Sequence, residues 1–145
     1  MMRVQLAVPD NDVLTANFYS QVFTLHGTAM MFLFAVPIFE AVADLLLPQM
    51  LGARDLPLPR LSAFGFWCFV IGGVFVCGSI FFGAAPGSGW FMYPPLTTNE
   101  EFTPGHGPDI GLLGLSFIEI ASIAAAVELI VGTLKCRPPG IRLNL

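Results

Sequence analysis

The sequence predicts an all-α integral membrane protein with three transmembrane helices. Of its 145 residues, 55% are apolar and only 11% are charged, and the mean hydropathy is +0.76. Three apolar stretches are each long enough for a helix to cross the roughly 30 Å of bilayer hydrocarbon, and no alternating pattern is long enough for a barrel strand. Six basic residues without a basic run exclude a nucleic-acid-binding surface.

The chain begins with a polar outer segment, residues 1–17, in which Pro9 to Asp12 predict a turn. The first span follows at 18–47. It contains no Lys or Arg, and as a helix it rises about 45 Å, so it can cross the bilayer with tilt. Pro48 predicts the end of this helix.

A short connection at 48–60 precedes the second span, at 61–83, and the third span covers 109–134 with Asp109 as its N-cap. Between these two spans lies a loop, residues 84–108, that is rich in Gly and Pro. Its aromatic residues favour an ordered loop at the membrane interface. Three glycines in the second span would let another helix approach closely: Gly72, Gly73 and Gly78.

The basic residues predict the orientation of the spans. Two of them, Arg54 and Arg60, lie in the short connection, and three follow the last span: Lys135, Arg137 and Arg142. The positive-inside rule therefore places residues 48–60 and the C-terminus in the cytoplasm, and the N-terminus and the 84–108 loop outside. An N-terminus outside without a signal is expected when a preceding span has been removed.

One face of the first span carries its ionisable groups. At 100° per residue, His26, Glu40 and Asp44 fall within about 40° of one another, so we expect them to share an interior face. A helical histidine can be an axial haem ligand, and Gly27 beside it would leave room for a macrocycle. A hydrogen-bonded interior histidine is the alternative interpretation.

The acidic residues form a second group of candidate functional residues. Glu40 and Asp44 lie near the cytoplasmic end of the first span, with Asp55 just beyond it. Such carboxylates can pass protons through water, or they can join helices as polar contacts. Glu119 and Glu128 differ by about 180° around the third helix, so they cannot both line one path.

The most specific string is GSGWFMYPPL, at Gly87–Leu96, in the long loop. It resembles the loop between the third and fourth helices of subunit I of the haem-copper oxidases. Three further segments resemble that family in the same order: Leu25–Thr28, Leu47–Asp55 and Pro59–Leu61. The resemblance covers roughly residues 20–145, and it implies that the three spans match helices two to four of a twelve-helix bundle.

The resemblance implies part of the catalytic subunit of a terminal respiratory oxidase in a bacterial inner membrane. Such a subunit passes electrons from cytochrome c or quinol to O2 and pumps protons. His26 would be one axial ligand of the low-spin haem iron, and Trp90 would contact a propionate of the high-spin haem. The second axial histidine and the copper ligands would come from the rest of the subunit, which is therefore the expected partner together with other oxidase subunits.

The same resemblance implies a proton-entry path. Its members would be Asp55 at the cytoplasmic mouth and five residues farther along: Asp44, Glu40, Ser62, Ser122 and Glu128. Asp44 and Glu128 stand where the family usually has neutral amides, and Glu119 stands where it has a small residue.

Two other functions remain open. The extra acids favour a non-catalytic truncated or split paralogue that is a structural subunit of an oxidase-like complex. A small proton carrier using Glu40, Asp44 and Glu128 is the third hypothesis.

Overall fold

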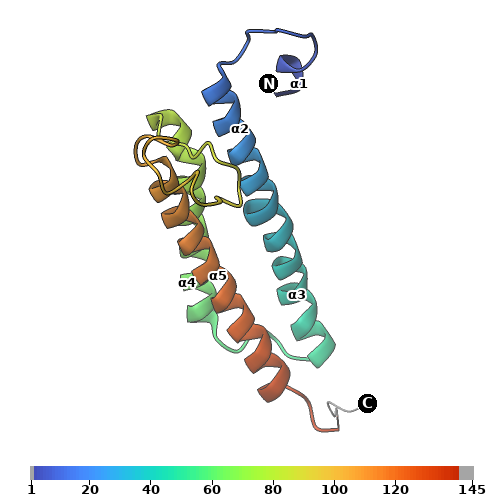
Figure 1. Ribbon diagram of the computed structural model, residues 1–145. Helices are drawn as coiled ribbons and strands as arrows, with labels where there is room; N and C mark the ends of the chain where they lie inside the picture. Colours follow the sequence, from blue (N-terminus) through green and yellow to red (C-terminus); the bar gives the residue numbers. More distant parts are fainter. Residues whose placement is uncertain (1, 141–145) are drawn as a thin grey trace.

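Helices alone form the regular structure of residues 2–140, the part of the chain that the computed structural model describes (Figure 1). The first long helix is continuous, and it consists of α2 (Ala16–Thr28), a π-helical stretch η1 (Ala29–Ala35) and α3 (Val36–Leu51). Arg142 lies outside the described residues.

The second long helix is α4 (Pro59–Gly78), which tightens into the 3-10 turn η2 (Ser79–Phe82), and the third is α5 (Gly107–Lys135). All three long helices, at Ala16–Leu51, Pro59–Phe82 and Gly107–Lys135, are long and apolar enough to cross a membrane. The predicted all-α class with three spans is confirmed.

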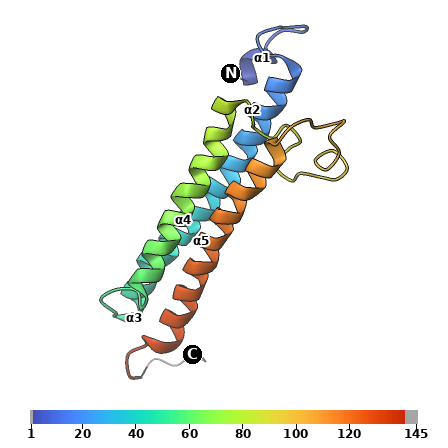
Figure 2. The same ribbon diagram turned by 90° about the vertical axis from the view of Figure 1, so that its left-hand side faces the viewer.

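The three long helices run side by side (Figures 1 and 2). The N-terminal segment and the long loop after η2 lie at one end of the molecule, and the short connection between α3 and α4 lies at the other. This arrangement agrees with the predicted alternation of the connections, whereas the side that faces the cytoplasm stays a prediction.

Two local predictions about helix ends were wrong. The first helix continues through Pro48 and ends at Leu51, because a proline removes only its own N–H, whereas Gly52 at φ 63° supplies the left-handed turn that stops a helix. The third helix begins at Gly107 rather than at Asp109, which lies in its first turn.

The N-terminal segment contains a short helix that its polar composition did not predict, α1 (Met2–Gln5). The Gln5 side chain bonds to the Asn11 carbonyl and accepts from the Leu14 N–H at 2.8 Å, which folds the segment back on itself. Thr15 then caps α2, since its hydroxyl accepts from the Phe18 N–H at 3.3 Å.

Close packing of small residues joins α4 to α5. A Cβ atom on Gly72 would lie 2.6 Å from the Gly114 carbonyl oxygen, and one on Gly114 would lie 2.7 Å from Val76 Cγ2. Gly73 faces Leu33 on the first helix, as expected of a close approach, but a Cβ on Gly78 would meet nothing within 4 Å. The prediction for Gly78 was wrong because this residue faces open space at the end of α4.

Candidate functional site

The π-helical stretch η1 changes which side of the first helix faces the rest of the chain. The Val36 N–H bonds to the Met31 carbonyl, five residues back, and Pro37 follows without an N–H of its own. Each such bond inserts one extra residue into a turn, which corresponds to about 100° of rotation. The faces of α2 and α3 are therefore out of the register that a regular α-helix would give.

Burial along the helix follows this rotation. Above the stretch, Thr24 and Thr28 are buried, whereas below it Pro37, Glu40 and Asp44 line a cavity against the other helices. In an uninterrupted α-helix, Thr28 and Pro37 would lie about 180° apart. The π-helical stretch instead brings both of them to the covered side.

His26 lies on the opposite side from Thr24 and Thr28, and its side chain is exposed. The prediction that His26 shares an interior face with Glu40 and Asp44 was wrong, because the π-helical stretch rotates the lower half of the helix relative to the upper half. Within residues 2–140, the imidazole makes no hydrogen bond to a side chain or to the backbone of another residue.

The long loop is anchored on the buried face of α2. The Gly89 N–H donates to the Thr24 hydroxyl at 2.9 Å, and that hydroxyl donates to the Ser20 carbonyl at 2.8 Å. Thr24 is fully buried. Its role was missed at the sequence level, although two threonines spaced i, i+4 in an apolar helix, Thr24 and Thr28, were a signal for a polar contact on that face.

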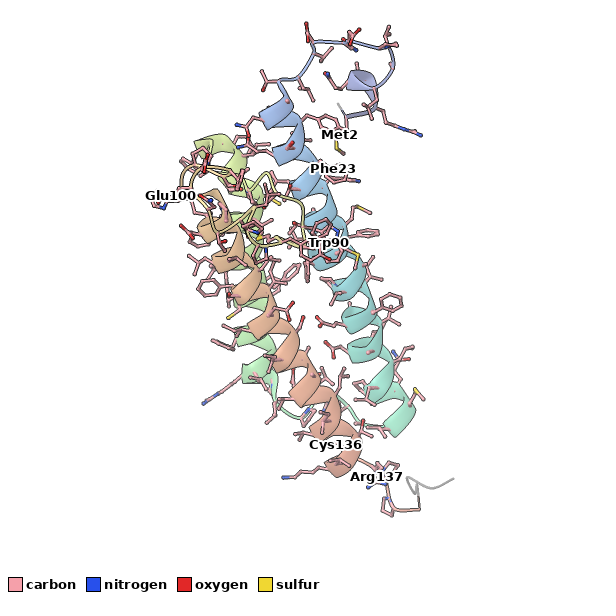
Figure 3. All side chains as sticks on the ribbon, in the orientation of Figure 1. Met2, Phe23, Trp90, Glu100, Cys136 and Arg137 are labelled. Atoms are coloured by element: carbon pink, nitrogen blue, oxygen red, sulfur yellow. The ribbon has the colours of Figure 1, made fainter. Side chains whose placement is uncertain are left out.

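Trp90 packs against the same part of α2 (Figure 3). A Cβ on Gly27 would lie 2.9 Å from Trp90 Cδ1, and the Trp90 ring meets Phe32 edge to face with centroids 6.0 Å apart. The space at Gly27 therefore holds the indole rather than leaving room for a macrocycle, and this interpretation of Gly27 was wrong. Trp90 remains 38% exposed, so part of this residue is free for another contact.

A cavity of about 200 Å³ lies between α3, α4 and α5. Its polar lining comes from four of the predicted proton-path residues: Glu40, Asp44, Ser62 and Glu128. The structure thus brings together residues from three helices that are distant in sequence.

The strongest contact in this cavity joins Ser62 on α4 to Glu128 on α5. The Ser62 hydroxyl donates to the Glu128 carboxylate, and its oxygen lies 2.7 Å from each carboxylate oxygen. Glu128 is only 1% exposed. Across the cavity, Asp44 Oδ1 is buried and makes no hydrogen bond. Three carboxyl groups therefore converge on one low-dielectric space with a single hydroxyl donor among them.

Two other predicted path residues stand apart. Ser122 is half-buried on α5 and is not among the residues that line the cavity. Asp55 is exposed in the connection between α3 and α4, where its carboxylate accepts from the Leu56 N–H at 2.8 Å. The structure does not join either residue to the cavity.

Glu119 lies on a different side of α5 from Glu128. Glu128 is buried against α4, whereas Glu119 is exposed. This difference agrees with the predicted placement of the two glutamates on opposite sides of the helix, and their exclusion from one path stays a prediction.

Within residues 2–140, one histidine that could bind an iron centre lies inside a span, and this residue is His26. The other histidine, His106, lies in the loop just before α5, is exposed, and places Nδ1 3.2 Å from Asp109 Oδ2. Among residues 2–140, no group of three or more His, Cys, Asp or Glu residues is arranged to hold a metal ion. A single exposed imidazole in an apolar helix fits one axial position of a haem.

The three apolar helices, their polar cavity and the exposed intramembrane histidine define a multi-pass helical membrane protein. The sequence profile of the family described as "Cytochrome C and Quinol oxidase polypeptide I" matches residues 1–145. The chain belongs to this family.

Bacterial oxidase subunits are similar to the chain over nearly its whole length. It is 39% identical over 140 residues to cytochrome c oxidase subunit 1 of Bacillus subtilis (strain 168), which covers 97% of the chain and 22% of the relative. It is 37% identical over 143 residues to quinol oxidase subunit 1 of the same organism, which covers 99% of the chain and 22% of that relative. The chain thus spans about a fifth of the length of these relatives.

Proposed function

We propose that this chain forms part of the catalytic subunit I of a terminal respiratory oxidase that transfers electrons from cytochrome c or quinol to O2. Its family membership supports this proposal, and so do the relatives, which are named as cytochrome c oxidase and quinol oxidase subunits. The remaining part of subunit I and other oxidase subunits are its proposed partners.

The exposed imidazole of His26 is the observation that carries the proposal. His26 lies eleven residues after Thr15, the N-cap of a 36-residue apolar helix, which corresponds to a depth of about 16 Å along the axis. A polar ring at this position is costly against lipid and so needs a partner. Because the described chain offers none, the ring is free to bind a group held between this helix and another.

We assign that group as a low-spin haem, with His26 as one axial ligand of its iron. When bound, such a haem carries single electrons through its iron. Trp90 would contact a propionate of a second, high-spin haem. The second axial ligand and the copper ligands belong to partner segments.

The cavity between α3, α4 and α5 supports a role in proton entry. Glu40, Asp44 and Glu128 supply carboxyl oxygens, and Ser62 supplies a hydroxyl that can donate to Glu128 while accepting from water. Asp55 would receive protons at the cytoplasmic end, and Ser122 would line the path farther along α5. Proton pumping is proposed on this basis.

One contact favours a second candidate, a non-catalytic structural subunit of an oxidase-like complex. Glu128 is fully buried and its carboxylate is bonded to Ser62, which is how a polar contact that joins two helices would look. In this role, the carboxylate would serve helix packing and would not move protons.

Oxygen uptake by the purified complex that contains this chain distinguishes the two candidates. We expect uptake with reduced cytochrome c or quinol as donor, and we expect His26→Ala to abolish it while His106→Ala leaves it unchanged. A complex that contains the intact chain but whose oxygen uptake is insensitive to His26→Ala would support the structural role.

A further inference from the structure

Glu119 is an exposed ionisable side chain near the middle of a span. It lies two residues before residue 121, the midpoint of α5, and so about 3 Å from the centre of the helix. Its side chain is exposed, and within residues 2–140 it makes no hydrogen bond or ion pair. The proton-path and haem assignments do not use it.

The surroundings of Glu119 are an apolar groove of about 430 Å³ between the first long helix and α5. Besides Glu119, the groove is lined by Phe32, Leu112, Leu115, Ser116 and Ile120. The only other polar side chain there is Ser116, whose hydroxyl already donates to the Leu112 carbonyl at 2.8 Å. The groove therefore contains no free donor for the Glu119 carboxyl group.

The two basic residues of the three long helices cannot reach this position. Lys135 on the same helix is sixteen residues away, or about 24 Å, and Arg60 stands at the start of α4, near the end of the molecule opposite the long loop. Lipid headgroups are also too distant, because the centre of the hydrocarbon lies about 15 Å from either surface. A counter-charge has to come from within the membrane.

The other side of α5 is already occupied. Gly111, Gly114, Ala121 and Ala124 are buried, and the glycines let α4 approach closely. The Glu119 side is thus the free side of this helix. Intramembrane carboxylates almost always pair with another group in protein, and membrane-spanning helices are the elements that carry side chains to this depth in a helical membrane protein.

We propose that the groove around Glu119 is the docking surface for a membrane-spanning helix from outside residues 1–145, and that this helix places one Arg, Lys or His side chain against Glu119. The occupant is defined by charge complementarity. Beside a lone carboxylate in an apolar groove, a helix that carries a cation would bind with a more favourable free energy than an uncharged helix.

The first test locates the occupant in the intact complex. A photo-crosslinking amino acid replaces Ser116, which lines the same groove, and the crosslinked peptide is identified by mass spectrometry. We expect it to come from a membrane-spanning segment that has Arg, Lys or His within one helical turn of the crosslinked residue. Crosslinks to lipid alone, or to a helix without a basic residue, would overturn the proposal.

The second test reverses the charge. Glu119→Lys should lower the yield of assembled complex by at least about tenfold, because two cations would then face each other. Ser116→Ala is the matched control and should change the yield less than about twofold, because it removes a hydroxyl that is already bonded within α5. Replacement of the crosslinked basic residue by Glu should restore assembly of the Glu119→Lys chain.

Folding of the variants is checked separately. Because Glu119 makes no hydrogen bond or ion pair within residues 2–140, the Glu119→Lys chain should reach the membrane in the same amount and with the same helical circular dichroism as the unchanged chain. Wild-type assembly of Glu119→Lys would refute the interface. None of these readouts depends on haem, so the haem proposal can fail while this one holds.

Discussion

The Ser62 hydroxyl is the hydrogen-bond donor to the buried Glu128 carboxyl group. Glu128 is 1% exposed, and its described side-chain hydrogen bonds are both to Ser62. Removal of the hydroxyl leaves a carboxyl group in the interior with no hydrogen-bond donor from residues 2–140. The penalty for such an unsatisfied group is about 1–3 kcal/mol in proteins, and interhelical hydrogen bonds in membranes are worth about 0.6–2 kcal/mol.

We therefore expect Ser62→Ala to lower the free energy of unfolding by about 1–2 kcal/mol. The measurement is the loss of helical circular dichroism of the detergent-solubilised protein as a denaturing detergent is added. Ser116→Ala is the control, and it should change this free energy by less than about 0.5 kcal/mol. Equal effects of the two substitutions would mean that the Ser62 contact contributes nothing specific.

For single residues, the sequence predicted which polar side chains line the cavity better than it predicted the side of the helix on which a side chain lies. Ser62 and Glu128 were both predicted to line one path, and the structure brings them into contact. His26 was predicted to face the same way as Asp44, but a period of 100° per residue holds only for an uninterrupted α-helix. The π-helical stretch has no clear mark in the sequence besides Pro37, which left this rotation unpredicted.

The packing of α4 on α5 depends on positions that accept no side chain. Gly72 and Gly114 are in mutual contact, since a Cβ on either would overlap atoms of the facing helix. Without a hydrophobic effect between helices in lipid, such close approach supplies much of the attraction through van der Waals contact. The helices α4 and α5 therefore form the most closely packed pair, against which the first helix and the long loop lie.

Substitution of Gly72 tests this interface. Gly72→Ala should destabilise the detergent-solubilised protein by about 1–3 kcal/mol, because the added methyl group forces the helices apart. Gly78→Ala on the same helix should be neutral or slightly stabilising, since a Cβ there meets nothing within 4 Å. A thermal unfolding series that ranks Gly78→Ala as the more damaging change would contradict the described packing.

Element boundaries were less predictable than the elements themselves. Hydropathy and length were enough for three spans, because a helix in lipid must satisfy its own backbone over the full bilayer thickness. The ends depend on single residues such as Gly52 and Thr15, whose effect comes from local geometry. The contact of Gly89 with Thr24 joins residues 65 positions apart, and no local pattern predicts such a pairing.

On the scale of the whole molecule, the two ends differ in charge and in structure. The long loop and the N-terminal segment share one end, and the short connection that carries Arg54 shares the other with the end of α5 (Figure 1). The positive-inside rule predicts that the Arg54 end faces the cytoplasm. The proposed haem ligand His26 would then lie toward the outside and the proton-entry cavity toward the cytoplasm.

Labelling with a membrane-impermeant maleimide tests this orientation. In a background without the other cysteines, Thr98→Cys in the exposed part of the loop should react in intact spheroplasts. A matched variant that retains only Cys136, just after α5, should react only after permeabilisation. The opposite pattern would invert the topology and with it the direction of proton entry.

The most direct test of the central claim is the reduced-minus-oxidised optical spectrum of the complete complex with and without the His26 imidazole. If His26 is an axial ligand, His26→Ala should abolish the low-spin haem absorption, because one imidazole alone leaves the other axial position open. His106→Ala, which removes the exposed loop histidine, should leave that absorption intact. An unchanged low-spin haem spectrum in His26→Ala would show that His26 is a packing residue and would contradict the assignment of the haem site to this helix.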